Sequence, residues 1–121
     1  MKSLILVAHG SRRTVSNIEI IQIATQLKPQ VADTYQHTGH AFLELAQPSI
    51  PDAIEQAIQA GATEITILPY FLSAGRHVSK DVPALVNQKQ QQHPAVQFRL
   101  APYLGGAGGI IDLLAVISKK I

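Results

Sequence analysis

The chain has no cysteine among its 121 residues. This absence excludes a disulfide framework, a zinc ribbon, a thiol nucleophile and a cysteine-bound iron–sulfur cluster. It is compatible with a reducing cytosol, and we expect a cytoplasmic protein. No apolar run is long enough to span a bilayer, and the apolar start of the chain is too short for a signal peptide. We therefore expect a soluble protein with no membrane partner.

Charged and aromatic residues are also scarce. Ten basic and eight acidic side chains leave a net charge of +2, and aromatic residues make up only 5% of the chain. A nucleic-acid-binding protein would carry a basic stripe, so nucleic acid is not an expected partner. Hydrophobic residues make up 46% of the chain, which predicts a folded globule. The length fits one domain that covers residues 1–121.

Strand and helix signals alternate along the chain. The expected strands cover residues 4–8, 40–45, 64–68 and 95–101. Capping boxes are expected to open the first helix at Ser16 and the second at Ser49. A third helix is expected to begin between residues 79 and 83, and a fourth to cover 110–117 after a glycine-rich loop.

Such alternation predicts an α/β fold with a parallel sheet and right-handed crossovers. We expect a flavodoxin-like lobe with four strands in the order 2-1-3-4 and helices on both faces. In sheets of this kind, ligands bind beyond the carboxyl ends of the strands. The residues at that rim are therefore the candidates for function.

Two histidines stand at matching points of this rim. His9 follows the first apolar strand and precedes Gly10, and His77 follows the third strand just ahead of a helix. Alone, either would be interpreted as a helix cap or a loop residue. Together, two neutral imidazoles from neighbouring strand ends can share one ion such as cobalt, nickel, zinc or iron. Glu44, near the end of the second strand, could add an oxygen ligand or act as a base, and its apolar neighbours predict partial burial.

The other three histidines are not expected to join this pair. His40 lies four residues before Glu44 on the expected strand, about 13 Å toward the opposite rim. His37 precedes that strand, and a solvated turn is the favoured interpretation of both residues. His93 is interpreted as a helix-end residue.

Four basic side chains flank the two histidines, and they indicate an anionic substrate. They are Arg12, Arg13, Arg76 and Lys80. Ser11, in the same loop, is a further candidate for substrate binding. Tyr70 and Phe71, with the leucine after them, form an apolar segment that could receive the flat face of a ring or belong to the core.

Three segments resemble the short sirohydrochlorin chelatases, the CbiX/SirB family of cobalt and iron chelatases. They are residues 9–12, 41–49 and 69–83. The resemblance implies a chelatase-like fold and ATP-independent insertion of a divalent metal ion into sirohydrochlorin. It matches His9 and His77 to the family's metal-site histidines, and Glu44 to their acidic partner.

The resemblance also has implications for partners and cofactors. Longer relatives hold two such lobes in one chain, so one lobe implies a homodimer around the tetrapyrrole. No cofactor is implied beyond the substrate ion, with Co²⁺ first and Fe²⁺ or Ni²⁺ as alternatives. The product would serve the biosynthesis of cobalamin or siroheme.

The sequence leaves three other functions open. The dimer could be a cobalt or nickel carrier that has no catalytic activity. A histidine phosphatase would also place a His-Gly pair after its first strand, but Ala8 stands where its motif needs arginine. A nucleotide-binding module would need a phosphate-cradling loop, for which Ser11-Arg12-Arg13 is a poor substitute.

Overall fold

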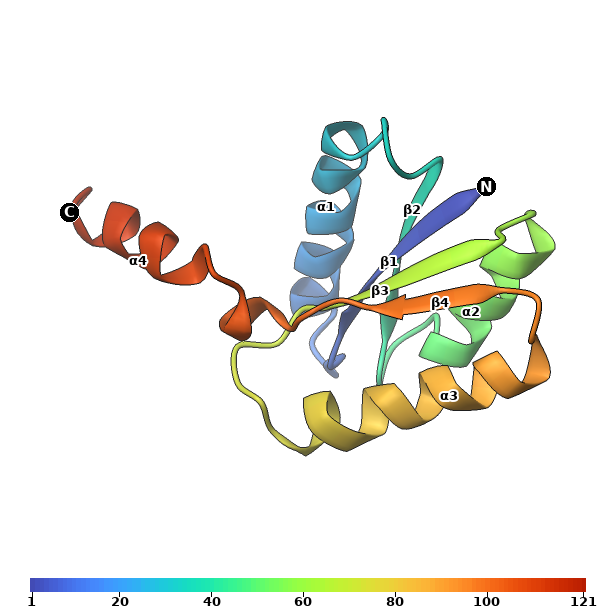
Figure 1. Ribbon diagram of the computed structural model, residues 1–121. Coiled ribbons are helices and arrows are strands. Elements are labelled where there is room, and N and C mark those ends of the chain that lie inside the picture. Colours follow the sequence, from blue (N-terminus) through green and yellow to red (C-terminus); the bar gives the residue numbers. More distant parts are fainter.

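The strand β1, Lys2–Ala8, lies in the middle of the sheet, and its last six residues are buried. A continuous apolar run suits this place, because a central parallel strand is covered on both faces. The computed structural model describes residues 1–121 and contains three further strands (Figure 1). These are β2 (His37–Phe42), β3 (Glu64–Pro69) and β4 (Gln97–Leu100). All pair in parallel in the order β2-β1-β3-β4, which confirms the predicted sheet.

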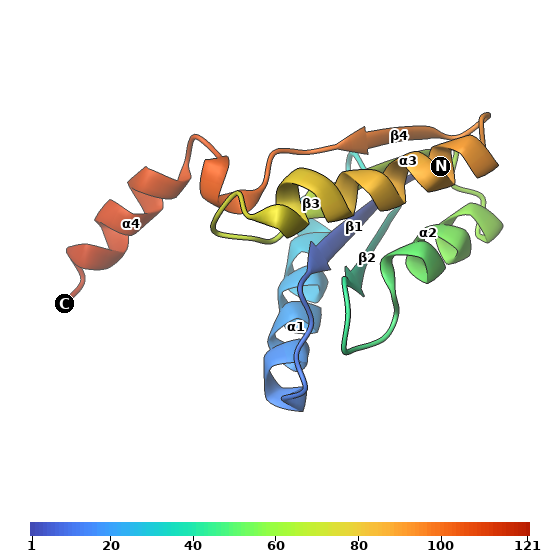
Figure 2. The ribbon, with the colours of Figure 1, turned by 90° about the horizontal axis from the view of Figure 1, so that it is seen from below.

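Helices cover both faces of the sheet, as predicted. The helix α1, Thr14–Gln30, packs along β2 on one face, and α2 (Ile50–Gln59) and α3 (Val82–Gln92) pack side by side on the other (Figure 2). Right-handed crossovers require this division. Strand β2 lies on one side of β1, whereas β3 and β4 lie on the other, so the helices that follow the change of direction pack on the opposite face.

The main core lies between the sheet and the two helices α2 and α3. Ile5 and Ile67 of the sheet, Ile50 and Ile54 of α2 and Val82 of α3 are almost completely buried there. Burying each such side chain contributes about 1.5–3 kcal/mol. This packing fixes β1 and β3 side by side, and so fixes the relative position of the loops that follow them.

The last helix, α4 (Ile110–Ser118), covers neither face of the sheet. It extends away from the body of the molecule (Figures 1 and 2), and its contacts are with the short turn Leu104–Gly106. Five of its apolar side chains are exposed by half or more. They are Ile111, Leu113, Leu114, Val116 and Ile117.

The larger differences from the predicted boundaries are at β2 and α1, while β1 begins two residues earlier than predicted and β4 covers Gln97–Leu100 instead of 95–101. Strand β2 lies three residues earlier than expected, because the backbone turns after Phe42 and Leu45 adopts a positive φ of 65°. The apolar residues that suggested a strand there belong to this turn. The capping box at Ser16 is wrong, since α1 begins two residues earlier and Ser16 lies inside it. Ser49 is confirmed as the N-cap of α2, because the Asp52 backbone N–H donates to its hydroxyl.

None of the helices combines the length and the apolar character that crossing a membrane requires.

An ion-pair cluster joins α2 to α3. The Glu55 carboxylate accepts hydrogen bonds from Lys89 Nζ at 2.9 Å and from His93 Nε2 at 3.1 Å. These two bonds, the one from Lys89 first, lower the pKa of Glu55 below its ordinary value of 4.5. His93 is thus more than a helix-end residue, because it ties the end of α3 to the neighbouring helix.

Replacing Glu55 by glutamine should lower the melting temperature at pH 7. A carboxylate with a lowered folded-state pKa contributes stability above its unfolded pKa, and that contribution is lost as the pH falls through the folded pKa. The difference between Glu55→Gln and the parent should therefore shrink below pH 4.5 and vanish in stronger acid. Thermal melts followed by circular dichroism between pH 7 and 3 test this. Glu19→Gln, an exposed carboxylate without an ion-pair partner, serves as the control and should show no such trend.

Candidate functional site

The two rim histidines lie against each other in the structure. His9 directly follows β1, and His77 begins the π-helical turn His77–Asp81 that leads into α3. The centroids of their rings are 4.6 Å apart and the rings are tilted by 59°. Both side chains keep nearly half of their surface in solvent, 46% for His9 and 40% for His77. Residues that are 68 positions apart in the sequence thus form one accessible pair of imidazoles.

Glu44 reaches the same place from the loop after β2. Its Oε1 lies 2.7 Å from His9 Nε2, and its backbone N–H donates to the His9 carbonyl at 3.0 Å. The expected partial burial is wrong, because 54% of its side chain is exposed. The turn that contains Leu45 swings these residues out of the sheet. The carboxylate therefore contacts His9 at the solvent edge of the rim.

Gly10 is what allows the loops after β1 and β2 to meet. Its φ is +95°, a region that side chains with a Cβ rarely adopt. A Cβ added there would lie 1.8 Å from the carbonyl oxygen of Glu44. No other residue type fits without moving Glu44 away from His9.

Asp81 is a site residue that the sequence analysis missed. Its Oδ2 lies 2.8 Å from His77 Nδ1, and Arg76 Nε stands 4.0 Å from its Oδ1. The available signal was the i,i+4 spacing of a histidine and an aspartate at a helix start. That signal identifies a contact only if residue 77 already lies in a helical turn.

The pair of imidazoles is the feature of the rim that could hold a metal ion. Nowhere in the chain do three or more His, Cys, Asp or Glu side chains form a group that could hold a metal ion. Two neutral imidazoles suit a borderline divalent ion and leave its other coordination positions to a second molecule. The geometry therefore suits an ion that is passed to a substrate.

The basic residues of the two loops are exposed. Arg12, Arg13, Arg76 and Lys80 all lie at the surface, and of these only Arg76 stands within 4.0 Å of a carboxylate. Ser11, in contrast, is committed to the local fold: its hydroxyl accepts from Arg13 N–H, and its backbone N–H donates to the Asn17 side chain.

The apolar segment after β3 divides its residues between core and surface. Phe71 packs against the core, Tyr70 is half-buried, and 75% of the surface of Leu72 is exposed. Leu72 is thus the part of the segment that stands free for a ligand.

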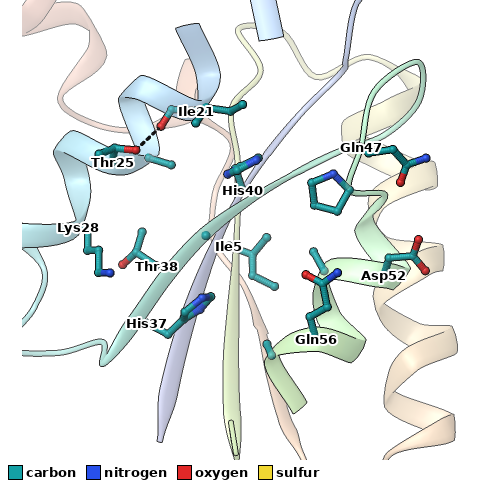
Figure 3. Close-up of a pocket in the computed structure, with 15 residues that line it drawn as sticks. Ile5, Ile21, Thr25, Lys28, His37, Thr38, His40, Gln47, Asp52 and Gln56 are labelled. Carbon is teal, nitrogen blue, oxygen red and sulfur yellow. Dashed lines mark hydrogen bonds between the residues drawn. The ribbon is translucent and has the colours of Figure 1, made fainter. Parts of the chain in front are cut away.

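His37 and His40 lie in β2 and not in a solvated turn, so that expectation is wrong. They line a cavity of about 700 Å³ at the edge of the sheet, between α1 and α2 (Figure 3). His37 Nδ1 lies 3.0 Å from Ser3 Oγ, and burial lowers the pKa of His40. As predicted, neither residue joins the rim pair.

The fold and the candidate site define a class: a doubly wound α/β protein with a pair of histidines at the strand ends, where such folds bind ligands. The chain belongs to the CbiX family, whose model matches residues 3–119. It shares 33% identity over 93 residues with a sirohydrochlorin cobaltochelatase of Methanocaldococcus jannaschii, covering 77% of this chain and 64% of that protein.

Two further proteins are similar to this chain. The chloroplastic sirohydrochlorin ferrochelatase of Arabidopsis thaliana is 32% identical over 111 residues, which cover 92% of this chain and 48% of that protein. The crystal structure of a CbiX protein from Marinobacter aquaeolei VT8 superposes with a TM-score of 0.80 at 30% identity, covering 99% of this chain and 96% of that one. The chain thus spans about half to two thirds of the two curated relatives, and nearly all of the Marinobacter protein.

Alanine at Gly10 should destabilise the protein more than alanine at Gly61. Both glycines have positive φ, +95° and +106°, but nothing lies within 4 Å of a Cβ at Gly61. Gly61→Ala then costs only backbone strain, about 1–2 kcal/mol. Gly10→Ala adds a clash with Glu44 that costs roughly 1–3 kcal/mol more. Urea unfolding measures the loss of stability in both variants. Equal losses would show that the loop around Glu44 moves aside without cost.

Proposed function

We propose that this chain is a sirohydrochlorin chelatase, an enzyme that inserts a divalent metal ion into sirohydrochlorin without ATP. The observation that carries the proposal is the pair of exposed imidazoles of His9 and His77, 4.6 Å apart at the carboxyl rim. Membership of the CbiX family supports it, as do the names of relatives that are cobalto- and ferrochelatases of this substrate.

In this mechanism the ion arrives on His9 and His77. Entry of the ion into the macrocycle releases two protons from the inner pyrrole nitrogens, so the site needs a proton acceptor. Glu44 suits this role, because it is exposed and its Oε1 lies 2.7 Å from His9 Nε2. A neutral imidazole that has passed on its ion is the second acceptor.

The substrate's own carboxylates supply the binding energy. Arg12, Arg13, Arg76 and Lys80 are exposed on the loops that carry the histidines, and carboxylates at the edge of the ring can dock on them. The exposed Leu72, with the half-buried Tyr70 near it in the chain, offers an apolar surface for the ring face, while Phe71 supports the segment from the core. Binding energy from the edge can then distort the ring and expose its nitrogen lone pairs. Ser11 contributes by holding the loop that presents the arginines.

We propose Co²⁺ as the first metal to test, with Fe²⁺ and Ni²⁺ as alternatives, because imidazole suits all three ions. No cofactor beyond the substrate ion is needed. We also propose a cytoplasmic location, with which a chain that has no cysteine is compatible.

We further propose that residues 1–121 act as one chelatase-like lobe that pairs with a second copy. A flat macrocycle has two faces, and one lobe provides only one wall of a cleft. The exposed apolar side chains of α4 support this, since surfaces of this kind are typical of protein interfaces.

The first test is to incubate the protein with sirohydrochlorin and each ion in turn, without ATP, and to follow the visible spectrum. We expect faster metallation than in the uncatalysed control. His77→Ala should abolish it and His9→Ala should lower it by about 100-fold or more. His37→Ala, which removes an exposed imidazole at the opposite end of the sheet, should retain it. Metal binding without acceleration by any ion would instead favour a carrier.

The second test concerns the partner. Sedimentation equilibrium should find a dimer, and the double variant Leu114→Glu, Ile117→Glu should be a monomer, because burying two carboxylates in an apolar interface is costly. Ser118→Glu adds a charge to the same helix at a polar position and is the control. A monomeric parent protein with full insertion activity would contradict the proposed pairing.

A further inference from the structure

The turn that carries His77 has an unusual hydrogen-bond pattern. The Val82 N–H donates to the His77 carbonyl five residues earlier, so His77–Asp81 is one π-helical turn placed directly before α3. Such turns are rare and are often found at functional sites. This one brings the side chains of its first and last residues into contact, with His77 Nδ1 and Asp81 Oδ2 2.8 Å apart.

The Asp81 carboxylate makes no hydrogen bond other than the one to His77. Aspartate before a helix usually caps it, but Asp81 makes no capping bond, because the π turn runs straight into α3. Its remaining neighbour is Arg76, at 4.0 Å and with 82% of its side chain exposed. The carboxylate is therefore committed to His77.

This contact decides which nitrogen of His77 carries the proton. An ionised carboxylate can only accept a hydrogen bond, so Nδ1 must donate to it. In the neutral imidazole, Nε2 then keeps its lone pair. A partner of this kind fixes both the tautomer and the orientation of a metal-binding histidine and strengthens its affinity for the metal.

We propose that Asp81 is a positioning residue, which holds His77 in the Nδ1–H tautomer so that Nε2 is the atom offered to the metal ion. This inference rests on the proposed role of His77 and extends it to a residue that does not itself touch the ion. Glu44 lies similarly near His9, but it comes from a different loop and its side chain is exposed on the rim. Asp81 belongs to the same helical turn as its histidine.

The test uses the full chain, with Co²⁺ alone as the probe. Long-range ¹H–¹⁵N correlation spectra at pH 8 report the tautomer of His77, and titration with Co²⁺ reports affinity. We expect Nδ1–H in the parent protein, loss of that preference in Asp81→Ala, and affinity for Co²⁺ that is about 10–100-fold weaker. Asp81→Asn should fall between them, because its amide oxygen can still accept from Nδ1–H.

Ser79→Ala is the matched control. The Ser79 hydroxyl donates to the Gly75 carbonyl at the same turn and makes no hydrogen bond to His77. An equal loss of affinity in this variant would overturn the proposal, because the effect would come from a disturbed turn. An unchanged tautomer and affinity in Asp81→Ala would overturn it as well.

A second variant and the choice of readouts make the result of this test unambiguous. If Asp81→Ala does not fold, Asp81→Asn decides: His77 in the Nε2–H tautomer with undiminished affinity contradicts the proposal. Neither readout uses sirohydrochlorin, so a failure of metal insertion would count against the proposed function and not against this inference.

Discussion

The site depends on the hydrogen bonds that β1 makes to both of its neighbours. Strand β1 pairs with β2 on one side and with β3 on the other, and the pairing continues past its end. The Tyr70 N–H donates to the Val7 carbonyl, while the N–H of Leu43 donates to the Ala8 carbonyl. His9 therefore leaves the sheet from between two anchored neighbours. A one-residue slip of either register would turn every side chain of β1 to the opposite face and undo its packing.

This anchoring explains why the rim needs so few residues to hold its geometry. His9 inherits its position from β1, and Glu44 follows through the backbone bond to the His9 carbonyl. The position of His77 is fixed separately, by the π turn ahead of α3. Val82, the first residue of α3, is fully buried in the core. Packing of α3 on the sheet thus brings two independently placed imidazoles together.

The fold and the two histidines could be predicted because their signals are local. Apolar runs, alternation of strands and helices, and a polar residue directly after a buried strand are all readable in sequence. The end of β2 was missed because residues 41–45 are as apolar as a strand, and only the backbone at Leu45 reveals the turn. Asp81 was missed because its contact requires a π turn, which no propensity predicts. The position of α4 could not be foreseen either, since packing between elements distant in sequence decides it.

The exposed rim also bears on how long an ion stays bound. Two neutral imidazoles contribute no negative charge, and both rings are nearly half open to solvent. If the proposed function holds, water can compete for an ion held there, and its residence time would be short. Rapid exchange of this kind would prevent a storage protein from retaining its ion. For the proposed chelatase, whose site must empty before the next cycle, such open access would favour rapid release of the metal.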